Sequence, residues 1–543
     1  MKSIVLFLCT VFLSGLSIAQ TPTDYLPKEF HKERRASFRA KMPKNSVAVV
    51  FANPIRNRAN DVDYVFHQDP NFYYLTGFRE PNAVLVLFSD NQTDENGVVY
   101  NEIIYVPKKD PRAELWNGKR LGVEGAKKEL GFVKAKISED FTTDKTDFLK
   151  FDRIFIERFK DDYRDSDRNN GEIFDLVQSF KKKTNYTDIN FLSMPQKRVY
   201  ELITATPIEN SANVAQIIGR AETMFPSLKE DAIVKGYKDA SNANNSELKK
   251  ELKQKAFEEL NGKTNIDFEF LTSKLAEMRE IKTPVELKLL TKAIRISAVG
   301  QIEVMKAMKP NMSETEIQGI HEFVYKKYGA EYEGYPSIVG AGNNGCILHY
   351  IENNKTKVGN DLVLMDLGAE YRGYTADVTR TIPANGKFNN EQKAIYELVL
   401  KAQDAGIAVC KEGTAFWQPG VETKKVINQG LVDLGIIKSV DEKHNYFPHG
   451  TSHHIGLDVH DPGTYGKLKE NMVITVEPGI YIPEGSNCDK KWWGIAVRIE
   501  DDILITKGEP KNLSEEAPRT IKAIEEMMAK KSILDDFVLP DLD

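Results

Sequence analysis

The sequence predicts two domains, an α/β amino-terminal domain followed by a second domain that is α/β or α+β. Three observations predict this class. The chain of 543 residues is too long for one ordinary hydrophobic core. Its composition, 41% hydrophobic and 28% charged, is typical of a folded globular protein and excludes disordered and fibrous classes. Short apolar runs also alternate with polar stretches of helical spacing along much of the chain.

The first residues have the features of a secretory signal. Lys2 precedes an apolar run, and small residues at Ser17 and Ala19 stand before Gln20. The run is shorter than the ~20 residues that a membrane-spanning helix needs, which argues against an amino-terminal anchor. We therefore expect a signal peptide over 1–19, cleaved after Ala19, and a secreted or periplasmic protein with no membrane attachment after cleavage.

Charge and cysteine content narrow the class further. The formal net charge is −6 and no basic stripe is interleaved with aromatic residues, so nucleic acid is not an expected partner. Cys9 leaves with the signal, and the mature chain keeps Cys346, Cys410 and Cys488, an odd number without a CxxC pair. A disulfide framework is therefore not expected, although the spacing leaves open whether two of the three pair.

The amino-terminal domain is expected over 24–194, where strands such as "SVAVVFA" and "AVLVLF" alternate with polar helical stretches. The segment 195–276 has a different residue pattern. Its "SELKKELKQKAFEEL" stretch places Glu and Lys at helical spacing with few apolar positions, which indicates a solvated helix in a connecting segment between domains. A partner-binding surface is the alternative interpretation of that stretch.

The second domain is expected over 277–510 and is followed by a tail over 511–543. Thr283, Pro284 and Glu286 predict the start of a helix with a capping box, and Ser313 with Glu316 predicts another. From Tyr335 onward the sequence is rich in strands.

A glycine-rich motif, "GAGNNG", satisfies the G-x-G-x-x-G pattern of dinucleotide-binding loops. That fingerprint requires a helix to open on the motif, whereas the strand-like run "CILHY" follows here. We expect a glycine-rich turn between strands.

Four carboxylates lie in apolar surroundings. Asp366 ends an apolar strand, turn residues "GAEYRG" follow, and Asp377 lies in the returning strand, so the two side chains could meet across an antiparallel pair. Glu477 and Glu500 are similarly flanked. Taken singly, Asp366 and Asp377 could be surface aspartates, and Glu500 could form an ion pair with Arg498 on the same strand face. All four together favour a cation, because an unpaired buried carboxylate costs several kcal/mol.

The stretch "YFPHGTSHHIGLDVHDPG" holds four of the nine histidines. Adjacent side chains of an extended segment point to opposite faces, so His453 and His454 should not both bind one metal, and one of them is structural or faces solvent. Four carboxylates with one imidazole are mostly hard oxygen ligands, which favours Mn²⁺ or a similar ion. Their charge exceeds that of one divalent ion, so we expect two.

Five blocks of sequence together resemble the pita-bread metallopeptidases, and among these the aminopeptidase P family most closely. The blocks are "ILHYIEN", "DLGAEYRGYTADVTRT", "PHGTSHHIGLDVHD", "TVEPGIYI" and "VRIEDDILIT". Upstream, "FANPIRNRANDVDYVFHQDPNFYYLTGFREPNAVLVLF" is similar to the amino-terminal domain of the same family. The resemblance implies an α/β amino-terminal domain plus an α+β pita-bread (creatinase/aminopeptidase-like) catalytic domain.

The resemblance also implies roles for single residues. The metal ligands would be Asp366, Asp377, His453, Glu477 and Glu500, holding two divalent metal ions, with Mn²⁺ favoured. His349 and His460 would contact the substrate near the scissile carbonyl and help to move protons. His449 would line the pocket for the proline ring, with Tyr481 and Arg498 in support. His454 inherits no ligand role.

The implied activity is that of a metal-dependent Xaa-Pro aminopeptidase, a hydrolase that releases the first residue from peptides with proline in second position. A hydroxide bridging the two metals would attack the Xaa-Pro carbonyl, and Glu477 would pass the proton to the leaving proline nitrogen. His460 and His349 would stabilise the developing oxyanion.

Two alternatives stay open. A prolidase, which takes only Xaa-Pro dipeptides, shares the fold and all five ligands. A non-catalytic peptide-binding protein on the same fold would belong to a different class. By resemblance only, a homo-dimer or homo-tetramer is expected, because Trp116 matches a position that can reach a neighbour's active site.

Overall fold

The protein is described here by a computed structural model that covers residues 22–160, 164, 171–186, 192–260, 264–537 and 539–540. The signal peptide expected over 1–19 lies outside the described residues. The chain divides into two compact units. Of the described residues, those between His31 and Leu275 form the amino-terminal unit, and those from Ala276 onward form the carboxy-terminal unit together with residues 22–30. None of the described helices has both the length and the apolar character needed to cross a membrane.

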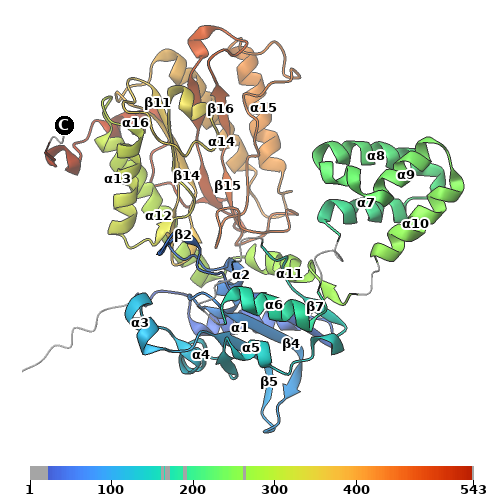
Figure 1. The fold of residues 1–543 in the computed structure, drawn as a ribbon. Coiled ribbons are helices and arrows are strands. Elements are labelled where there is room, and N and C mark those ends of the chain that lie inside the picture. Colours follow the sequence, from blue (N-terminus) through green and yellow to red (C-terminus); the bar gives the residue numbers. More distant parts are fainter. Residues whose placement is uncertain are drawn as a thin grey trace, which may run out of the picture. The chain divides into compact units, whose positions relative to one another are not determined.

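A six-stranded mixed sheet forms the centre of the amino-terminal unit, in the order β6-β5-β4-β1-β7-β8 (Figure 1). β4 pairs antiparallel with both β1 and β5, whereas β7 runs parallel to β1 and to β8. The strands are β1 (Ser46–Phe51), β4 (Val84–Thr93), β5 (Val99–Val106), β6 (Ala135–Ile137), β7 (Arg153–Phe155) and β8 (Ile266–Asp267). The exposed strands β2 (Asn57–Ala59) and β3 (Val62–Asp63) form a separate pair.

Helices and aromatic side chains complete the core of that sheet. The helices are α1 (Lys28–Lys41), α2 (Pro70–Thr76), α3 (Pro111–Asn117), α4 (Gly122–Leu130), α5 (Asp140–Thr143) and α6 (Ile173–Lys183). Phe141, Phe148 and Phe180 pack with strand residues such as Val49 and Ile154 in one buried cluster. The alternation of apolar runs with polar helical stretches therefore corresponds to a real sheet covered by helices.

Four helices with a separate core follow in the chain (Figure 1, green). They are α7 (Met194–Ala205), α8 (Ser211–Met224), α9 (Ala232–Asn242) and α10 (Ser246–Leu260). α10 is exposed over most of its surface, as predicted, but Leu252 and Ala256 are buried against the other three helices. The segment is therefore a small folded bundle rather than one solvated connecting helix. β8 and α11 (Phe270–Arg279) follow it, and β8 belongs to the central sheet.

The carboxy-terminal unit consists of short antiparallel strands flanked by long helices (Figure 1). The helices are α12 (Pro284–Ala307), α13 (Glu314–Lys327), α14 (Asn390–Ala408), α15 (Gln418–Asp433) and α16 (Ile521–Met528). One sheet contains β10 (Ile338–Ala341), β11 (Leu362–Leu367) and β14 (Val378–Pro383), and a second contains β13 (Tyr374–Thr375), β12 (Ala369–Tyr371) and β9 (Tyr332–Glu333). A third contains β15 (Val473–Val476), β18 (Asp501–Leu504) and β19 (Lys511–Asn512). The strands β16 (Gly479–Ile482) and β17 (Ile495–Arg498) form a two-stranded sheet.

Both predicted helix starts are present. Thr283 and Glu286 form a reciprocal capping box at the start of α12, with Pro284 in the first turn. Ser313 accepts a hydrogen bond from the backbone N–H of Glu316 at the start of α13. α12 packs against β12, β13 and β14, whereas α14 packs against β15, β16 and β17, so each helix covers a different half of the unit.

The "GAGNNG" motif begins in the last two residues of β10 and continues as a 3-10 helix, η5 (Gly342–Cys346). The expected strand at "CILHY" is wrong, because residues 347–350 have no strand partner. The cause lies in side chains: the buried Glu314 carboxylate accepts hydrogen bonds from Asn344 Nδ2 (3.1 Å) and Tyr350 Oη (2.9 Å). These bonds hold both ends of the segment against the start of α13.

Residues at both ends of the chain join the carboxy-terminal unit. Arg372 donates from Nε to Asp24 Oδ1 at 2.7 Å, and Tyr25 Oη donates to Glu331 at 3.0 Å, so the first described residues are clasped to this unit. At the other end, β19 pairs with β18 beyond the boundary expected at 510. Part of the segment expected as a tail therefore belongs to the folded unit.

Candidate metal centre

Three of the predicted ligands meet at one point. Single ligand atoms of Asp377, His453 and Glu500 all lie within 4.8 Å of one another. Asp377 stands directly before β14, and Glu500 lies in the two-residue link between β17 and β18. His453 precedes His454, which forms an isolated bridge with Ile474 of β15. Residues from distant parts of the sequence are thus brought together by strand ends.

Asp366 joins this group through the pairing of β11 with β14. The pair is antiparallel, as the sequence predicted, and Asp366 stands opposite Thr379, two residues beyond Asp377. The chain reverses in the β12–β13 hairpin, where Arg372 (φ 53°) and Gly373 (φ 85°) both adopt the left-handed backbone that a tight hairpin turn requires. Tyr335 Oη lies 2.6 Å from Asp366 Oδ1 and 2.5 Å from Asp377 Oδ1, and so connects the two carboxylates.

The second half of the unit contributes Glu477, which directly follows β15. His453 Nε2 lies 3.6 Å from Glu477 Oε1 and 3.4 Å from Asp377 Oδ2. Thr379 of β14 donates a 2.7 Å hydrogen bond to Glu500 Oε2, which joins the two halves. All five predicted ligands therefore surround one small volume.

The orientation of His453 suits a ligand. Its Nδ1 lies 3.0 Å from the carbonyl oxygen of His454, to which Nδ1–H can donate. With the proton on Nδ1, the lone pair of Nε2 faces the carboxylates. Metal-binding histidines are commonly held in this tautomer by a backbone carbonyl.

The electrostatics of the group favour a cation. Burial, followed by the neighbouring carboxylates, raises the pKa of Asp377 and of Glu500 well above the ordinary range. Burial alone would also raise the pKa of Asp366, but the Arg498 charge and the hydrogen bonds from Tyr335 and Arg498 together outweigh burial and lower that pKa. Glu500 Oε1 is buried and has no hydrogen-bond partner among the described residues. A donor set of carboxylate oxygens and one imidazole with an unsatisfied oxygen fits divalent metal ions.

The predicted substrate residues form a chain beside the carboxylates. Arg498 donates from Nη1 to Tyr481 Oη at 2.8 Å and from Nη2 to Asp366 Oδ2 at 2.5 Å. Tyr481 Oη lies 2.8 Å from His449 Nε2. Burial, with the Arg498 charge, lowers the pKa of His449 to about 4, so this histidine is neutral near pH 7.

The two remaining predicted histidines are exposed. The ring of His460 packs edge-on against that of His453 at 4.4 Å between centroids. Burial, followed by the electrostatic interaction with His453, lowers the pKa of His460. The electrostatic interaction with His349 also lowers the pKa of His449 and that of His460, though by less than burial does.

Two side chains of this group, Tyr335 and Thr379, were not predicted from the sequence. Tyr335 lies in "EGYPS", where no charge or spacing marks it, and only the fold brings its hydroxyl onto the two aspartates. Thr379 offered a signal, because it alternates with Asp377 along one strand face.

His454 is structural, the first of the two options that the sequence left open. Its side chain is fully buried between the rings of Phe416 and Tyr465, at centroid distances of 4.7 and 5.2 Å. It points away from the carboxylates, in keeping with the opposite faces expected for neighbouring extended residues.

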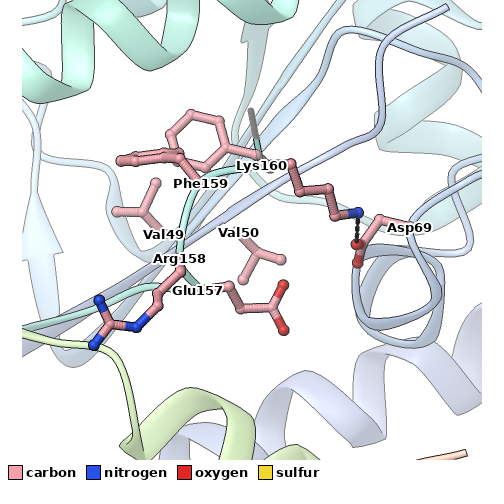
Figure 2. Close-up of a pocket in the computed structure, with 8 residues that line it drawn as sticks. Val49, Val50, Asp69, Glu157, Arg158, Phe159 and Lys160 are labelled. Carbon is pink, nitrogen blue, oxygen red and sulfur yellow. Dashed lines mark hydrogen bonds and ion pairs between the residues drawn. The ribbon is translucent and has the colours of Figure 1, made fainter. Parts of the chain in front are cut away.

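A small pocket in the amino-terminal unit is a weaker candidate. Figure 2 shows Lys160 directed toward Asp69 beside Val49, Val50 and Glu157, and Lys160 Nζ lies 3.3 Å from Asp69 Oδ2. Its volume of about 20 Å³ is enough for about one water molecule. The carboxylate group of the carboxy-terminal unit remains the candidate site.

Comparisons with known proteins identify the family of the chain. Residues 288–507 match the model of metallopeptidase family M24, and residues 31–154 match that of the aminopeptidase P amino-terminal domain. A Haemophilus influenzae protein named Xaa-Pro aminopeptidase is 35% identical over 93% of this chain and 98% of its own length. The chain belongs to metallopeptidase family M24. The Escherichia coli Xaa-Pro aminopeptidase is 32% identical over 92% of this chain and 97% of its own length.

Solved structures support the same M24 assignment. Aminopeptidase P from E. coli with the inhibitor Pro-Leu matches with a TM-score of 0.71 and 30% identity, over 93% of this chain and 98% of that one. The Pseudomonas aeruginosa aminopeptidase PepP matches with a TM-score of 0.71 and 31% identity over the same shares. The predicted resemblance and the predicted fold, an α/β domain plus a pita-bread catalytic domain, are confirmed.

Proposed function

We propose that this M24 metallopeptidase is a metal-dependent Xaa-Pro aminopeptidase, which releases the first residue of peptides with proline in second position. The observation that carries the proposal is likeness over almost the whole length of proteins bearing that name, 98% of the H. influenzae relative. The pairing of the M24 and aminopeptidase P amino-terminal models on one chain agrees with it.

The proposed ligands are Asp366, Asp377, His453, Glu477 and Glu500, which would hold two divalent ions. Mn²⁺ is the proposed metal because oxygen ligands predominate. When bound, such ions supply Lewis acidity toward the scissile carbonyl and a nucleophile at neutral pH. The buried oxygen of Glu500 without a partner supports their presence.

The side chains of the protein would then bind the peptide and move its protons. Glu477 is the proposed proton carrier to the leaving proline nitrogen, and burial raises its pKa, which favours the protonated form. His460 and His349, both exposed beside the site, would donate to the developing oxyanion. Neutral His449 with Tyr481 and Arg498 would line the pocket for the proline ring.

A comparison of two substrates tests this function. The purified protein is stripped with a chelator, reloaded with Mn²⁺, and given a Xaa-Pro-Yaa tripeptide or a Xaa-Pro dipeptide. We expect release of the first residue from the tripeptide, lost on chelation and restored by Mn²⁺. Turnover of the dipeptide alone would instead indicate a prolidase, and metal binding without any turnover would indicate a peptide-binding protein.

Export and assembly are also proposals. The sequence of residues 1–19 supports cleavage after Ala19 and a secreted or periplasmic location. Trp116, with 85% of its surface exposed, supports a homo-dimer or homo-tetramer. Amino-terminal sequencing of the protein from its native host and sedimentation of the purified protein test the two.

A further inference from the structure

Two buried glutamines occupy equivalent places in the two halves of the carboxy-terminal unit. Gln301 lies on α12, Gln403 lies on α14, and the side chains of both are fully buried. α12 covers β14 and α14 covers β15 and β17, so each glutamine faces the strands that carry carboxylates.

Gln301 connects the two strands that bear Asp366 and Asp377. Its Nε2 donates to the carbonyl of Met365 at 3.1 Å and to that of Val378 at 2.8 Å. Both partners can only accept, so the NH₂ group of the amide must face them. Met365 directly precedes Asp366, and Val378 directly follows Asp377.

Gln403 makes the matching contacts in the other half. Its Nε2 donates to the carbonyls of Val476 and Ile499, both at 3.2 Å, and to Asp501 Oδ2 at 2.8 Å. Val476 directly precedes Glu477, and Ile499 directly precedes Glu500. Its Oε1 accepts from Arg519 Nη1 at 3.2 Å, which fixes the amide in this orientation.

Every carboxylate of the centre therefore has a neighbouring carbonyl held by one of two amide groups. We propose that Gln301 and Gln403 are positioning residues that hold the four carboxylates at the spacing the metal ions require. At Asp366, Glu477 and Glu500, the held carbonyl belongs to the planar peptide group that joins the ligand's own Cα, so fixing it fixes the start of the side chain. The proposal rests on the ligand set given under the proposed function.

The physical need arises from the carboxylates themselves. Four carboxylates in one buried volume repel one another when they are ionised, and each lies within one residue of the end of a strand, where the support from ladder hydrogen bonds ends. An amide that bridges two strand ends opposes their separation at this point. Supporting hydrogen bonds of this kind are typically worth 10- to 100-fold in metal affinity or activity.

The test replaces each glutamine by methionine, which has a similar length and no N–H donor. Gln392→Met is the matched control, because Gln392 is also buried on α14 but accepts a hydrogen bond from the backbone N–H of Asn389, away from the ligand strands. Mn²⁺ affinity of the metal-free proteins is measured by calorimetry, and kcat and KM on a Xaa-Pro-Yaa peptide at saturating Mn²⁺.

We expect Gln301→Met and Gln403→Met each to weaken Mn²⁺ binding by about 10-fold or more and to lower kcat with little change in KM, while Gln392→Met keeps wild-type values. Equal Mn²⁺ affinity in all three variants would overturn the positioning role. A wild-type protein that binds no Mn²⁺ would overturn the ligand set and the proposed function with it. Within the described part of the chain, Gln301 Oε1 has no hydrogen-bond partner that the substitution would remove. Gln301→Met therefore decides the question alone if Gln403→Met does not fold.

Discussion

Arg498 sets the balance of charge at the centre. It pairs with Asp366, and no other arginine or lysine among the described residues pairs with the four carboxylates. The pKa of Asp366 is accordingly lowered, whereas those of Asp377, Glu477 and Glu500 are raised. The metal-free centre therefore has three carboxylates that need a cation or a proton.

The change Asp377→Asn removes one of these charges where His453 and Tyr335 converge. Loss of a group that only supports a metal ligand typically lowers activity by up to about 100-fold. Asp377 is a proposed ligand itself, so we expect peptidase activity to fall by more than that. The asparagine is isosteric, so the far-ultraviolet circular dichroism should stay unchanged. Activity is measured with saturating Mn²⁺, and the exposed Asp433→Asn serves as control. Activity near wild type would remove Asp377 from the ligand set.

A different outcome is expected at His454. Replacing this buried ring by alanine leaves a cavity between Phe416 and Tyr465 and should cost about 3 kcal/mol of stability. Mn²⁺ affinity should change little, because only the backbone carbonyl of His454 contacts His453. Urea unfolding and calorimetry of His454→Ala separate the two effects. A large loss of metal affinity with unchanged stability would assign the ring to the metal site.

At the scale of elements, the link between α11 and α12 is fastened to the histidine-rich loop. Asp461, beside His460, is buried and pairs with Lys282 at 2.8 Å and also with Arg279. Its backbone N–H donates to the carbonyl of His454 at 3.0 Å, the same oxygen that faces His453 Nδ1. This one carboxylate therefore ties the loop to the beginning of the unit.

The change Asp461→Asn should lower the free energy of unfolding by about 3–5 kcal/mol, because it removes the negative charge that two buried cations share. Burial raises the pKa of Asp461, but Arg279 and then Lys282 outweigh it, and the net shift is downward. A lowered folded pKa means that the contribution is complete above the unfolded value of about 3.9 and is lost as pH falls through the folded pKa. Urea midpoints at pH 7 and below pH 4 test this. The exposed Asp458→Asn should leave the midpoint unchanged at both pH values.

Sequence patterns predicted the elements whose signal is local. Thr283 and Glu286 gave the start of α12, and the apolar run before Asp366 gave the β11–β14 pair. The "CILHY" segment was not predictable, because its shape depends on Glu314, which is distant in sequence. The same holds for Tyr335, Gln301 and Gln403, whose contacts with the site exist only through tertiary packing. The four-helix bundle was missed because α10 alone has too few apolar residues to reveal a shared core.

At the scale of the whole molecule, each of the two units contains a buried hydrophobic cluster of its own. The proposed metal site lies entirely within the carboxy-terminal unit. Three of the four tryptophans, Trp417, Trp492 and Trp493, belong to that unit, and the fourth, Trp116, is 85% exposed. Tryptophan fluorescence should therefore report mainly on the unit that binds metal.

We expect metal to stabilise one unit and not the other. Mn²⁺ at about 100 times its dissociation constant contributes about 2.7 kcal/mol to the folded state that binds it. Thermal unfolding followed by tryptophan fluorescence should shift upward with Mn²⁺ and return with a chelator, while a second, calorimetric transition from the amino-terminal unit stays in place. Equal shifts of both transitions would show that metal binds elsewhere or that the units unfold together.

The hydrogen bonds of Asp24 with Arg372 and of Tyr25 with Glu331 attach the first described residues to the carboxy-terminal unit. Residues before His31 and after Leu275 belong to the same unit, so the entire amino-terminal unit is topologically an insertion within the other. A single proteolytic nick between those two points leaves each fragment holding a piece of the carboxy-terminal unit. The fragments of a nicked molecule should therefore stay associated under native conditions and separate only in denaturant.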